Sequence, residues 1–283
     1  MKSIYDLHIH SNLSDGEYDI STLVNKIKNE NIKIFSICDH DNIDSIDCLK
    51  NLKLNDVDYI SGVEISSYYK KMGIHILGYY IDGNVLPLKR LLFKINQKRK
   101  KRMKEILKKI KIKKGIVLSN DEIDEIMSSN NVGKKILSKI LIKNNLGTNH
   151  LEIRNNYLSN LGCKTSYRAN IKKVCKVIKL AGGIPILAHP KELELRYGVK
   201  LESVIKDMIK CGIKGIEVYH SIHDDNDISR YLNIAKKYNL LISGGSDFHT
   251  SKSNKKIGLL SKEDYVITYE KFSILEKNNL VAK

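Results

Sequence analysis

Short apolar segments that end in histidine or in an acidic residue recur along this chain, and they constrain its fold more than any other feature. Runs typical of strands cover residues 4–8, 34–38, 59–65, 74–80, 184–187, 215–218 and 241–243. Windows with helical spacing of apolar residues alternate with them, beginning near Ser21, the predicted N-cap of the first, and at 171–181, 201–211 and 227–238. This alternation predicts an α/β fold built on a parallel sheet or barrel.

The strand pattern disappears in the middle of the chain. Leucine and isoleucine recur there at helical spacing, and Ser119 or Asn120 is expected to cap the second of these helices. Further helical windows cover 134–143 and 150–161. We therefore predict an all-helical insertion at 84–163, within a sheet domain made of residues 1–83 and 164–283.

Basic residues are in excess, and the excess is concentrated in one stretch. The formal net charge is +17, and residues 89–114 alone hold fourteen Lys or Arg against one acid, Glu105. A solvated helix face and a surface for a polyanion such as RNA both fit this pattern. A basic RNA-binding module without catalysis is therefore one hypothesis for function.

Cysteine usage and hydropathy bear on the cellular compartment. The five cysteines are scattered and form no C-x-x-C pair, which favours a reducing cytoplasm over a disulfide framework. No run of 18 apolar residues occurs, and Asp6 stands where a signal peptide needs an apolar stretch. We expect a cytoplasmic protein with no membrane partner and no obligate protein partner.

Eight of the nine histidines end or follow a predicted strand. These are His8, His10, His40, His75, His189, His220, His223 and His249, whereas His150 falls in the insertion. In β/α folds the carboxyl ends of the strands form the active-site face, so polar residues repeated there are poorly explained by core packing. Five acidic residues share these segments, namely Asp15, Asp39, Asp41, Glu64 and Asp247.

Imidazole and carboxylate together are ligands of Zn²⁺, Mn²⁺ and Fe²⁺. His8 and His10 point to the same side of a strand because side chains alternate with period two, so both can reach one ion. No convergent cysteines accompany them, which excludes a structural zinc site of the cysteine type. A divalent metal centre is indicated by five features in this order along the chain: H-x-H, D-H-D, a strand-end Glu, A-H-P and S-D-x-H.

The segments DLHIHSNLSDG, SICDHDNI, GVEIS, HILGY, ILAHP, GIEVYHSIH and GGSDFH resemble the PHP (polymerase and histidinol phosphatase) family of metal-dependent phosphoesterases. They span nearly the whole chain. KRKKRMKEIL, LSNDEI and NNYL in the insertion resemble the branch that acts on nucleoside 3′,5′-bisphosphates and on short RNA from the 5′ end. The resemblance implies a distorted, TIM-like (β/α)7 barrel with the helical insertion as a cap on the substrate side.

The resemblance also implies two or three divalent ions per chain, with manganese favoured and zinc or iron as alternatives. Carried over by motif, one ion takes His8, His10, Glu64 and Asp247, a second takes Asp15, His40 and His249, and a third takes His75, His189 and the shared Glu64. A metal-bound hydroxide would attack phosphorus in line, because close-set ions acidify a bridging water and stabilise the phosphoryl charge. Asp39 and Asp41 are interpreted as groups that orient ligands, although Asp41 equally fits an N-cap of the following helix.

Substrate-binding groups are expected among the remaining histidines and cations. His220 or His223 is expected to protonate the leaving oxygen or to bind phosphate, although His223 equally fits a solvent-facing loop. Arg168 could clamp a second phosphate. Where the branch usually shows Gly-Arg-Pro-His, the chain reads GKKI. Lys134 therefore keeps the positive charge of the arginine but not its planar, bidentate guanidinium, and Ile136 replaces the histidine.

We therefore predict a metal-dependent phosphoric ester hydrolase. It is expected to release phosphate from nucleoside 3′,5′-bisphosphates, or 5′-mononucleotides from short RNA, so its partner is a nucleotide or a short RNA. The alternative enzyme is a histidinol-phosphate phosphatase or another small phosphomonoesterase, which shares the motifs but less obviously the insertion.

Overall fold

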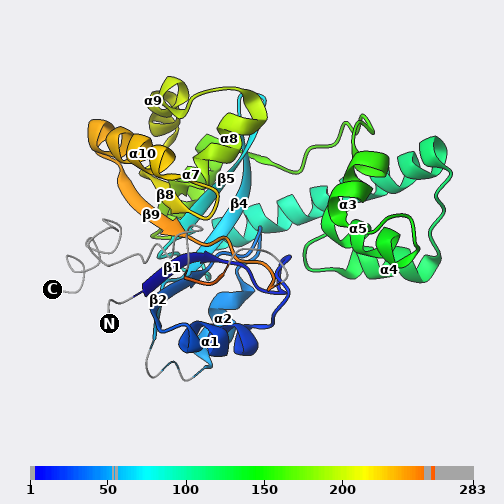
Figure 1. Cartoon of the computed structure of the whole chain (residues 1–283), viewed down its shortest axis with the longest axis horizontal. Coiled ribbons are helices and arrows are strands. Elements are labelled where there is room, and N and C mark those ends of the chain that lie inside the picture. Colours follow the sequence, from blue (N-terminus) through cyan, green and yellow to red (C-terminus); the bar gives the residue numbers. More distant parts are fainter. Residues whose placement is uncertain (1–3, 53, 55–56, 252–255, 259–283) are drawn as a thin grey trace. The chain divides into compact units, whose positions relative to one another are not determined.

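The chain forms two compact units. The structure, a computed structural model drawn in Figure 1, describes residues 4–52, 54, 57–251 and 256–258. The sheet unit consists of Met1–Lys89 and Ala169–Lys283, and the helical unit consists of Arg90–Arg168. The sheet domain predicted above includes residues 259–283, which lie outside the described residues.

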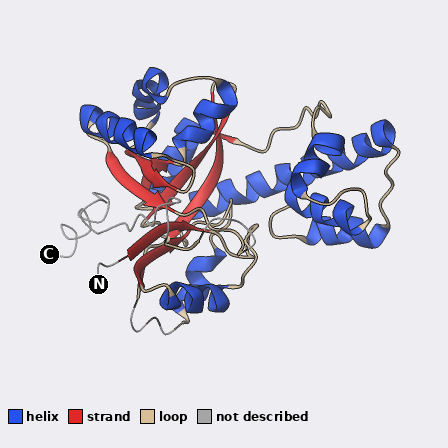
Figure 2. Ribbon diagram, viewed as in Figure 1, coloured by secondary structure: helices blue, strands red, loops and turns tan. Residues whose placement is uncertain are grey.

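Two sheets form the centre of the sheet unit (Figure 2). The smaller has the order β1-β2-β3, with β1 at Ile4–Ile9, β2 at Ile32–Ile37 and β3 at Asp58–Tyr59. The larger has the order β6-β4-β5-β7-β8-β9, with β6 at Ala169–Asn170, β4 at Gly62–Tyr69, β5 at Met72–Tyr79, β7 at Ile184–Leu187, β8 at Gly215–His220 and β9 at Leu241–Gly245. Neighbouring strands are parallel except that β5 runs antiparallel to β4 and β7. The predicted α/β class is therefore confirmed.

The prediction of one strand at 59–65 is wrong, because the chain changes its partner within that segment. Tyr59 lies in β3 opposite Phe35, and the Ile60 amide still donates to the Phe35 carbonyl at 2.8 Å. Gly62 then begins β4, which pairs with β5 instead. The other predicted strands overlap β1, β2, β5, β7, β8 and β9.

The two sheets meet at the strand ends that carry the histidines. An isolated bridge joins Ile9, at the end of β1, to Phe248, which follows β9. A second bridge joins His40, after β2, to Glu64 in β4. A Cβ atom at Gly245 in β9 would lie 2.3 Å from a backbone nitrogen of β1, so only glycine permits this approach. The carboxyl ends of several strands are thus drawn to one place.

Six helices accompany the described strands of the sheet unit (Figures 1 and 2). They are α1 (Ile20–Asn29), α2 (Asp44–Lys50), α7 (Ile171–Leu180), α8 (Pro190–Tyr197), α9 (Leu201–Cys211) and α10 (Asp225–Tyr238). Leu23 and Ile27 of α1 pack into the core beside the smaller sheet. Ser21 is wrong as the cap of α1, since Asp19 Oδ1 accepts from the Thr22 amide at 2.9 Å and a carboxylate also suits the positive helix end.

The helical unit has its own apolar core. Its elements are α3 (Leu86–Lys114, which begins in the sheet unit), α4 (Asn120–Ser128), α5 (Lys134–Lys143), α6 (His150–Ile153) and a π-helical turn (Arg154–Leu158). Ser119 caps α4: its Oγ accepts from the Glu122 amide at 3.2 Å, and the Glu122 carboxylate accepts from the Ser119 amide at 2.8 Å. The helix predicted at 150–161 is shorter than expected, because Ser159 turns to an extended conformation.

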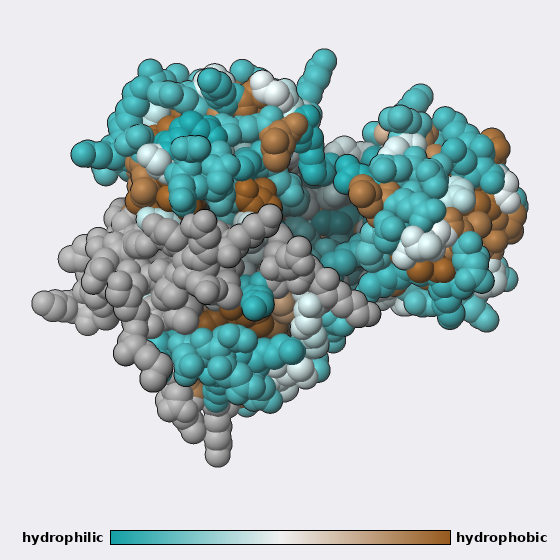
Figure 3. Space-filling model, viewed as in Figure 1, coloured by the Kyte–Doolittle hydropathy of each residue, from teal (hydrophilic) through white to brown (hydrophobic). Residues whose placement is uncertain are grey.

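Most of the surface visible in Figure 3, outside the grey atoms, is hydrophilic. Large apolar side chains nevertheless reach the surface of the helical unit, where Phe93, Ile112, Val117 and Leu151 are all more than half exposed. Among the described residues, no helix combines the length and the apolar character that crossing a bilayer requires.

Candidate metal centre

The structure brings the nine predicted ligands together within the sheet unit. Seven of them lie at the ends of strands or in the loops that follow, but the prediction of a strand-end position is wrong for Glu64 and His75, which lie inside β4 and β5. Nitrogen and oxygen atoms of eight of these nine side chains and of His220 lie within 4.8 Å of one another in four groups. The groups are His10–Asp15–His40–His249, His8–His220–Asp247, His8–His10–Glu64 and His40–Glu64–His75. His189 joins them through its Nε2, which lies 3.0 Å from Glu64 Oε1. The grouping differs from the expected sets because His220 accompanies His8 and Asp247, and because His40 contacts Glu64.

Glu64 is at the centre of the cluster and is fully buried. Its Oε2 lies 2.8 Å from His40 Nδ1 and 3.3 Å from His10 Nε2, and its Oε1 lies 3.0 Å from His75 Nδ1. Burial alone raises the pKa of Glu64, but the imidazoles of His40 and His75 hold that pKa well below its usual range. The side chain is therefore a carboxylate that faces several nitrogen donors at once.

His10 is a neutral imidazole at physiological pH. Burial, followed by repulsion from His249, lowers the pKa of His10 to about 4. Its Nε2 lies 3.3 Å from Asp247 Oδ1, and His249 Nε2 lies 3.1 Å from Asp15 Oδ1. A neutral imidazole keeps a lone pair for a metal ion, so the electrostatics suit the predicted role.

Glu217 is a buried member of the site that the sequence analysis missed. Its Oε1 lies 2.9 Å from His8 Nδ1, and its Oε2 accepts from the His189 amide at 2.7 Å. Burial alone raises the pKa of Glu217, but His8 and His220 lower it to about 2. A proton held on His8 Nδ1 by this carboxylate leaves Nε2 as the lone-pair atom toward the cluster. An acid inside the apolar run GIEVYH was the signal that could have identified it.

The two acids that flank His40 support the loops of the site. Asp39 accepts from the Ser11 amide at 2.8 Å and from the Ser14 hydroxyl at 2.5 Å, which ties down the loop that carries Asp15. Burial raises the pKa of Asp39 to about 6. Asp41 Oδ1 accepts from the Ser66 amide at 2.7 Å. The helix-cap interpretation of Asp41 is wrong, because α2 begins at Asp44 with Ile43 in the N-cap position.

His220 and His223 extend the cluster from the end of β8. His220 Nε2 lies 3.6 Å from Asp247 Oδ2. The ring centroids of His220 and His223 lie 5.3 Å apart. His223 Nδ1 donates to the Val218 carbonyl at 2.7 Å. The interpretation of His223 as a solvent-facing loop residue is wrong, since it is only 3% exposed. Burial, and then the neighbouring His220, lowers the pKa of His223 to about 3.

The other predicted substrate groups belong to the helical unit. Lys134 Nζ donates to the Leu158 carbonyl at 2.6 Å, and partial burial lowers its pKa. The Arg168 guanidinium lies over the Tyr167 ring, 5.0 Å from its centroid. His150 is exposed at the start of α6, as a solvated residue would be.

Three residues of the site adopt the left-handed backbone conformation. Asp41, His189 and Asp247 have positive φ values of 52°, 26° and 52°, a region that non-glycine residues rarely occupy. Such conformations cost on the order of 1–3 kcal/mol each and persist where the surroundings hold them in place. The Asp247 amide, for example, is held by the His8 carbonyl at 2.8 Å.

The cluster suits divalent cations on its own geometry. His10 Nδ1 and His220 Nε2 are buried and make no hydrogen bond to any described residue. Glu64 Oε2 faces the nitrogens of His40 and His10 at 2.8 and 3.3 Å, but without hydrogen-bond geometry. Buried polar atoms without such bonds are costly, and a cation that they coordinate removes that cost. The donors are imidazole nitrogens and carboxylate oxygens, which Mn²⁺, Zn²⁺ and Fe²⁺ accept.

Comparison with known families decides the relationship. The PHP domain matches residues 6–250. The chain belongs to the PHP family. The match includes every residue of the cluster, from His8 to His249, and it runs through the helical unit as well.

Three relatives of this PHP protein illustrate the activities found among similar chains. A 5′-3′ exoribonuclease of Haemophilus influenzae is 31% identical over 88% of this chain and 91% of its own length. A phosphoribosyl 1,2-cyclic phosphate 1,2-diphosphodiesterase of Eggerthella lenta is 25% identical over 87% and 94%. A 3′,5′-nucleoside bisphosphate phosphatase of Chromobacterium violaceum is 24% identical over 86% of each chain.

The fold of this PHP protein is also found in solved structures. An amidohydrolase from Chromobacterium violaceum superposes with a TM-score of 0.82 at 22% identity, over 98% of this chain and 96% of the other. Membership of the PHP family, together with relatives named as phosphatases and phosphodiesterases, indicates a metal-dependent hydrolase of phosphoric esters.

Proposed function

We propose that this PHP protein hydrolyses phosphoesters of nucleotides, releasing phosphate from nucleoside 3′,5′-bisphosphates or 5′-mononucleotides from short RNA. The observation that carries the proposal is the cluster in which Glu64 lies within 3.0 Å of His40, His75 and His189. Relatives from Chromobacterium violaceum and Haemophilus influenzae are named for these two activities. Both substrates are ribose phosphoesters that carry a second phosphate.

Divalent ions are the proposed cofactors, two or three per chain, with manganese first and zinc or iron as alternatives. They would be held by His8, His10, Asp15, His40, Glu64, His75, His189, Asp247 and His249. Ions bound there supply a water of lowered pKa and neutralise charge on the phosphoryl group. Glu217 positions the His8 side chain and the His189 backbone through its two hydrogen bonds, and Asp39 positions the loop that carries Asp15.

Proton transfer to the leaving oxygen is assigned to His220, with phosphate binding as its alternative role. It is 1% exposed and lies beside Asp247, where a reacting group would meet it. His223 is a poorer acid, because its Nδ1–H is occupied by the Val218 carbonyl and its pKa is lowered to about 3. Its proposed role is to hold His220 or to contact the substrate.

The proposal extends to architecture and compartment. The order of the larger sheet and the bridges to β1 and β2 support a distorted, TIM-like (β/α)7 barrel. Residues 84–163 are proposed as the substrate-side cap, and Arg168 and Lys134 as cations for phosphate. The five free cysteines favour a reducing, cytoplasmic location.

A substrate panel tests the proposal. The purified protein is dialysed against EDTA, reconstituted with Mn²⁺ and offered adenosine 3′,5′-bisphosphate, a 5′-phosphorylated trinucleotide RNA, a ribose 1,2-cyclic phosphate ester and histidinol phosphate. We expect EDTA to abolish turnover, Mn²⁺ to restore it, and the first two compounds to be preferred. Turnover that survives complete metal removal would exclude the mechanism, and preference for histidinol phosphate would favour the alternative enzyme. Salt-sensitive RNA binding without any turnover would favour the RNA-binding module.

A further inference from the structure

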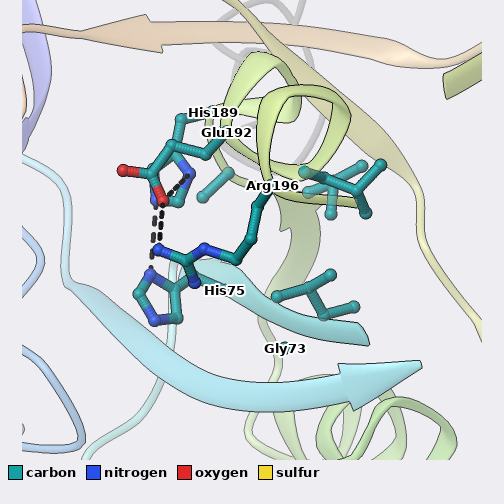
Figure 4. Close-up of a pocket in the computed structure, with 9 residues that line it drawn as sticks. Gly73, His75, His189, Glu192 and Arg196 are labelled. Atoms are coloured by element: carbon teal, nitrogen blue, oxygen red, sulfur yellow. Dashed lines mark hydrogen bonds and ion pairs between the residues drawn. The ribbon is translucent and has the colours of Figure 1, made fainter. Parts of the chain in front are cut away.

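A small hollow, whose empty space including the open solvent at its mouth is about 280 Å³, adjoins the candidate metal centre on one side (Figure 4). His75 and His189 belong both to the cluster and to the wall of this hollow. Arg196 and Glu192, from the neighbouring helix α8, line it as well, and Figure 4 shows the Arg196 guanidinium directed toward the His75 side of the hollow. A cation therefore stands beside the cluster without belonging to it.

The interaction that holds Arg196 is loose. Its Nη2 lies 3.6 Å from Glu192 Oε2, beyond hydrogen-bond distance, and both side chains are 44% exposed. An exposed pair of this kind contributes little to stability. The planar donors of the guanidinium thus remain available to another oxyanion, and phosphate is the anion whose geometry they match.

The second arginine of the sheet unit provides the contrast, since that unit contains only Arg196 and Arg230. Arg230 donates to both carboxylate oxygens of Glu194, at 2.6 and 2.7 Å, and also to Asp227 at 2.8 Å. Its N–H donors are occupied by these carboxylates, and the bonds to Glu194 join α10 to α8. Within the described part of the chain, Arg196 makes only the long contact with Glu192.

The orientation of His189 decides which phosphate Arg196 can reach. His189 Nε2 faces Glu64 at 3.0 Å, whereas its Nδ1 faces Glu192 Oε2 at 3.8 Å. Arg196 pairs with that outer carboxylate, which faces the opposite nitrogen of the His189 ring from Glu64. A group bound to it is consequently a different one from the group being hydrolysed.

We propose that Arg196 binds the second, non-reacting phosphate of the substrate in this hollow. The inference rests on the proposed function and deepens it, because it makes compounds with two separate phosphate groups the preferred class over simple monoesters. Glu192 pairs with the arginine until that phosphate arrives. The start of α8 directly after His189 adds positive potential on the same side.

The test replaces Arg196 and compares esters with one and two phosphates. In Mn²⁺-loaded protein, we expect Arg196→Gln to raise KM for adenosine 3′,5′-bisphosphate about 10- to 100-fold, as expected for loss of a charge-assisted pair. KM for p-nitrophenyl phosphate should not change, and Arg196→Lys should recover part of the loss. The matched control, Lys210→Gln, removes one cation at a side chain that is 80% exposed and should change neither KM.

A binding measurement separates this inference from the proposed function. Isothermal titration of metal-depleted protein with adenosine 3′,5′-bisphosphate should show at least tenfold weaker binding to Arg196→Gln, with manganese content after reloading equal to that of the wild type. Unchanged bisphosphate binding, or an equal loss for both esters, would overturn the role of Arg196. A wild type that hydrolyses neither ester would overturn the proposed function alone, because the titration still reports on the arginine.

Discussion

Replacing Glu217 by glutamine tests whether this residue sets the proton on His8. The carboxylate accepts two bonds, from His8 Nδ1 at 2.9 Å and from the His189 amide at 2.7 Å, and all three groups are buried. Glutamine offers one acceptor oxygen and one NH₂ donor. The His189 amide cannot change, so the amide oxygen must stay with it and the NH₂ must face His8.

The consequence depends on whether a metal ion is present. In the metal-free protein, burial lowers the pKa of His8 but Glu217 and Glu64 raise it well above its usual value, so the contact with Glu217 is a buried ion pair. Its loss should lower the free energy of unfolding by about 3–5 kcal/mol. A metal ion needs Nε2 unprotonated, which leaves two donors facing each other inside the core. That penalty is about 1.5–3 kcal/mol and corresponds to a metal affinity about 10- to 100-fold weaker.

The assay is competition for Mn²⁺ with a chelator, paired with urea unfolding of the metal-free protein. Glu202→Gln is the matched control, because Glu202 also accepts at 2.6 Å, from Lys237, but is 54% exposed. It should leave the metal affinity unchanged. Wild-type Mn²⁺ affinity in Glu217→Gln would refute the argument that this carboxylate selects the His8 tautomer.

Three further predictions concern the frame of the site and the helical unit. Gly245→Ala should destabilise the protein by at least about 2 kcal/mol in urea unfolding, whereas Gly83→Ala, whose Cβ would meet only an ordinary 3.5 Å contact, should not. Glu105→Gln should lower the melting temperature of the protein at neutral pH, since Glu105 accepts the Lys164 and Thr165 amides and these bonds lower its pKa from 4.5 to about 2. Because that pKa is depressed, the stabilisation is full above pH 4.5, and the gap between wild type and variant should close as pH falls toward 2. Ser119→Ala should cost about 1 kcal/mol through loss of the α4 cap, and no change in unfolding would contradict the capping box.

Local patterns in the chain were sufficient for most elements and for the set of candidate ligands. Period-two and helical spacings are local, so the strands β1, β5 and β8 and the helix α5 could be predicted without tertiary information. Short segments failed where a long-range partner decides the outcome. β3 and β4 read as one apolar run, and only the change of partner after Tyr59 separates them.

The sequence by itself determined the chemistry of the site, because imidazole and carboxylate groups can bind metal ions wherever they meet. The order of the motifs also identified the family. Tertiary structure decided which donors meet. Glu217 lies 209 positions from His8 and yet touches it, a contact that no spacing predicts. Likewise His223 is buried rather than solvent-facing, and Arg196 faces the cluster, because burial and direction depend on how strands and helices far apart in the chain pack together.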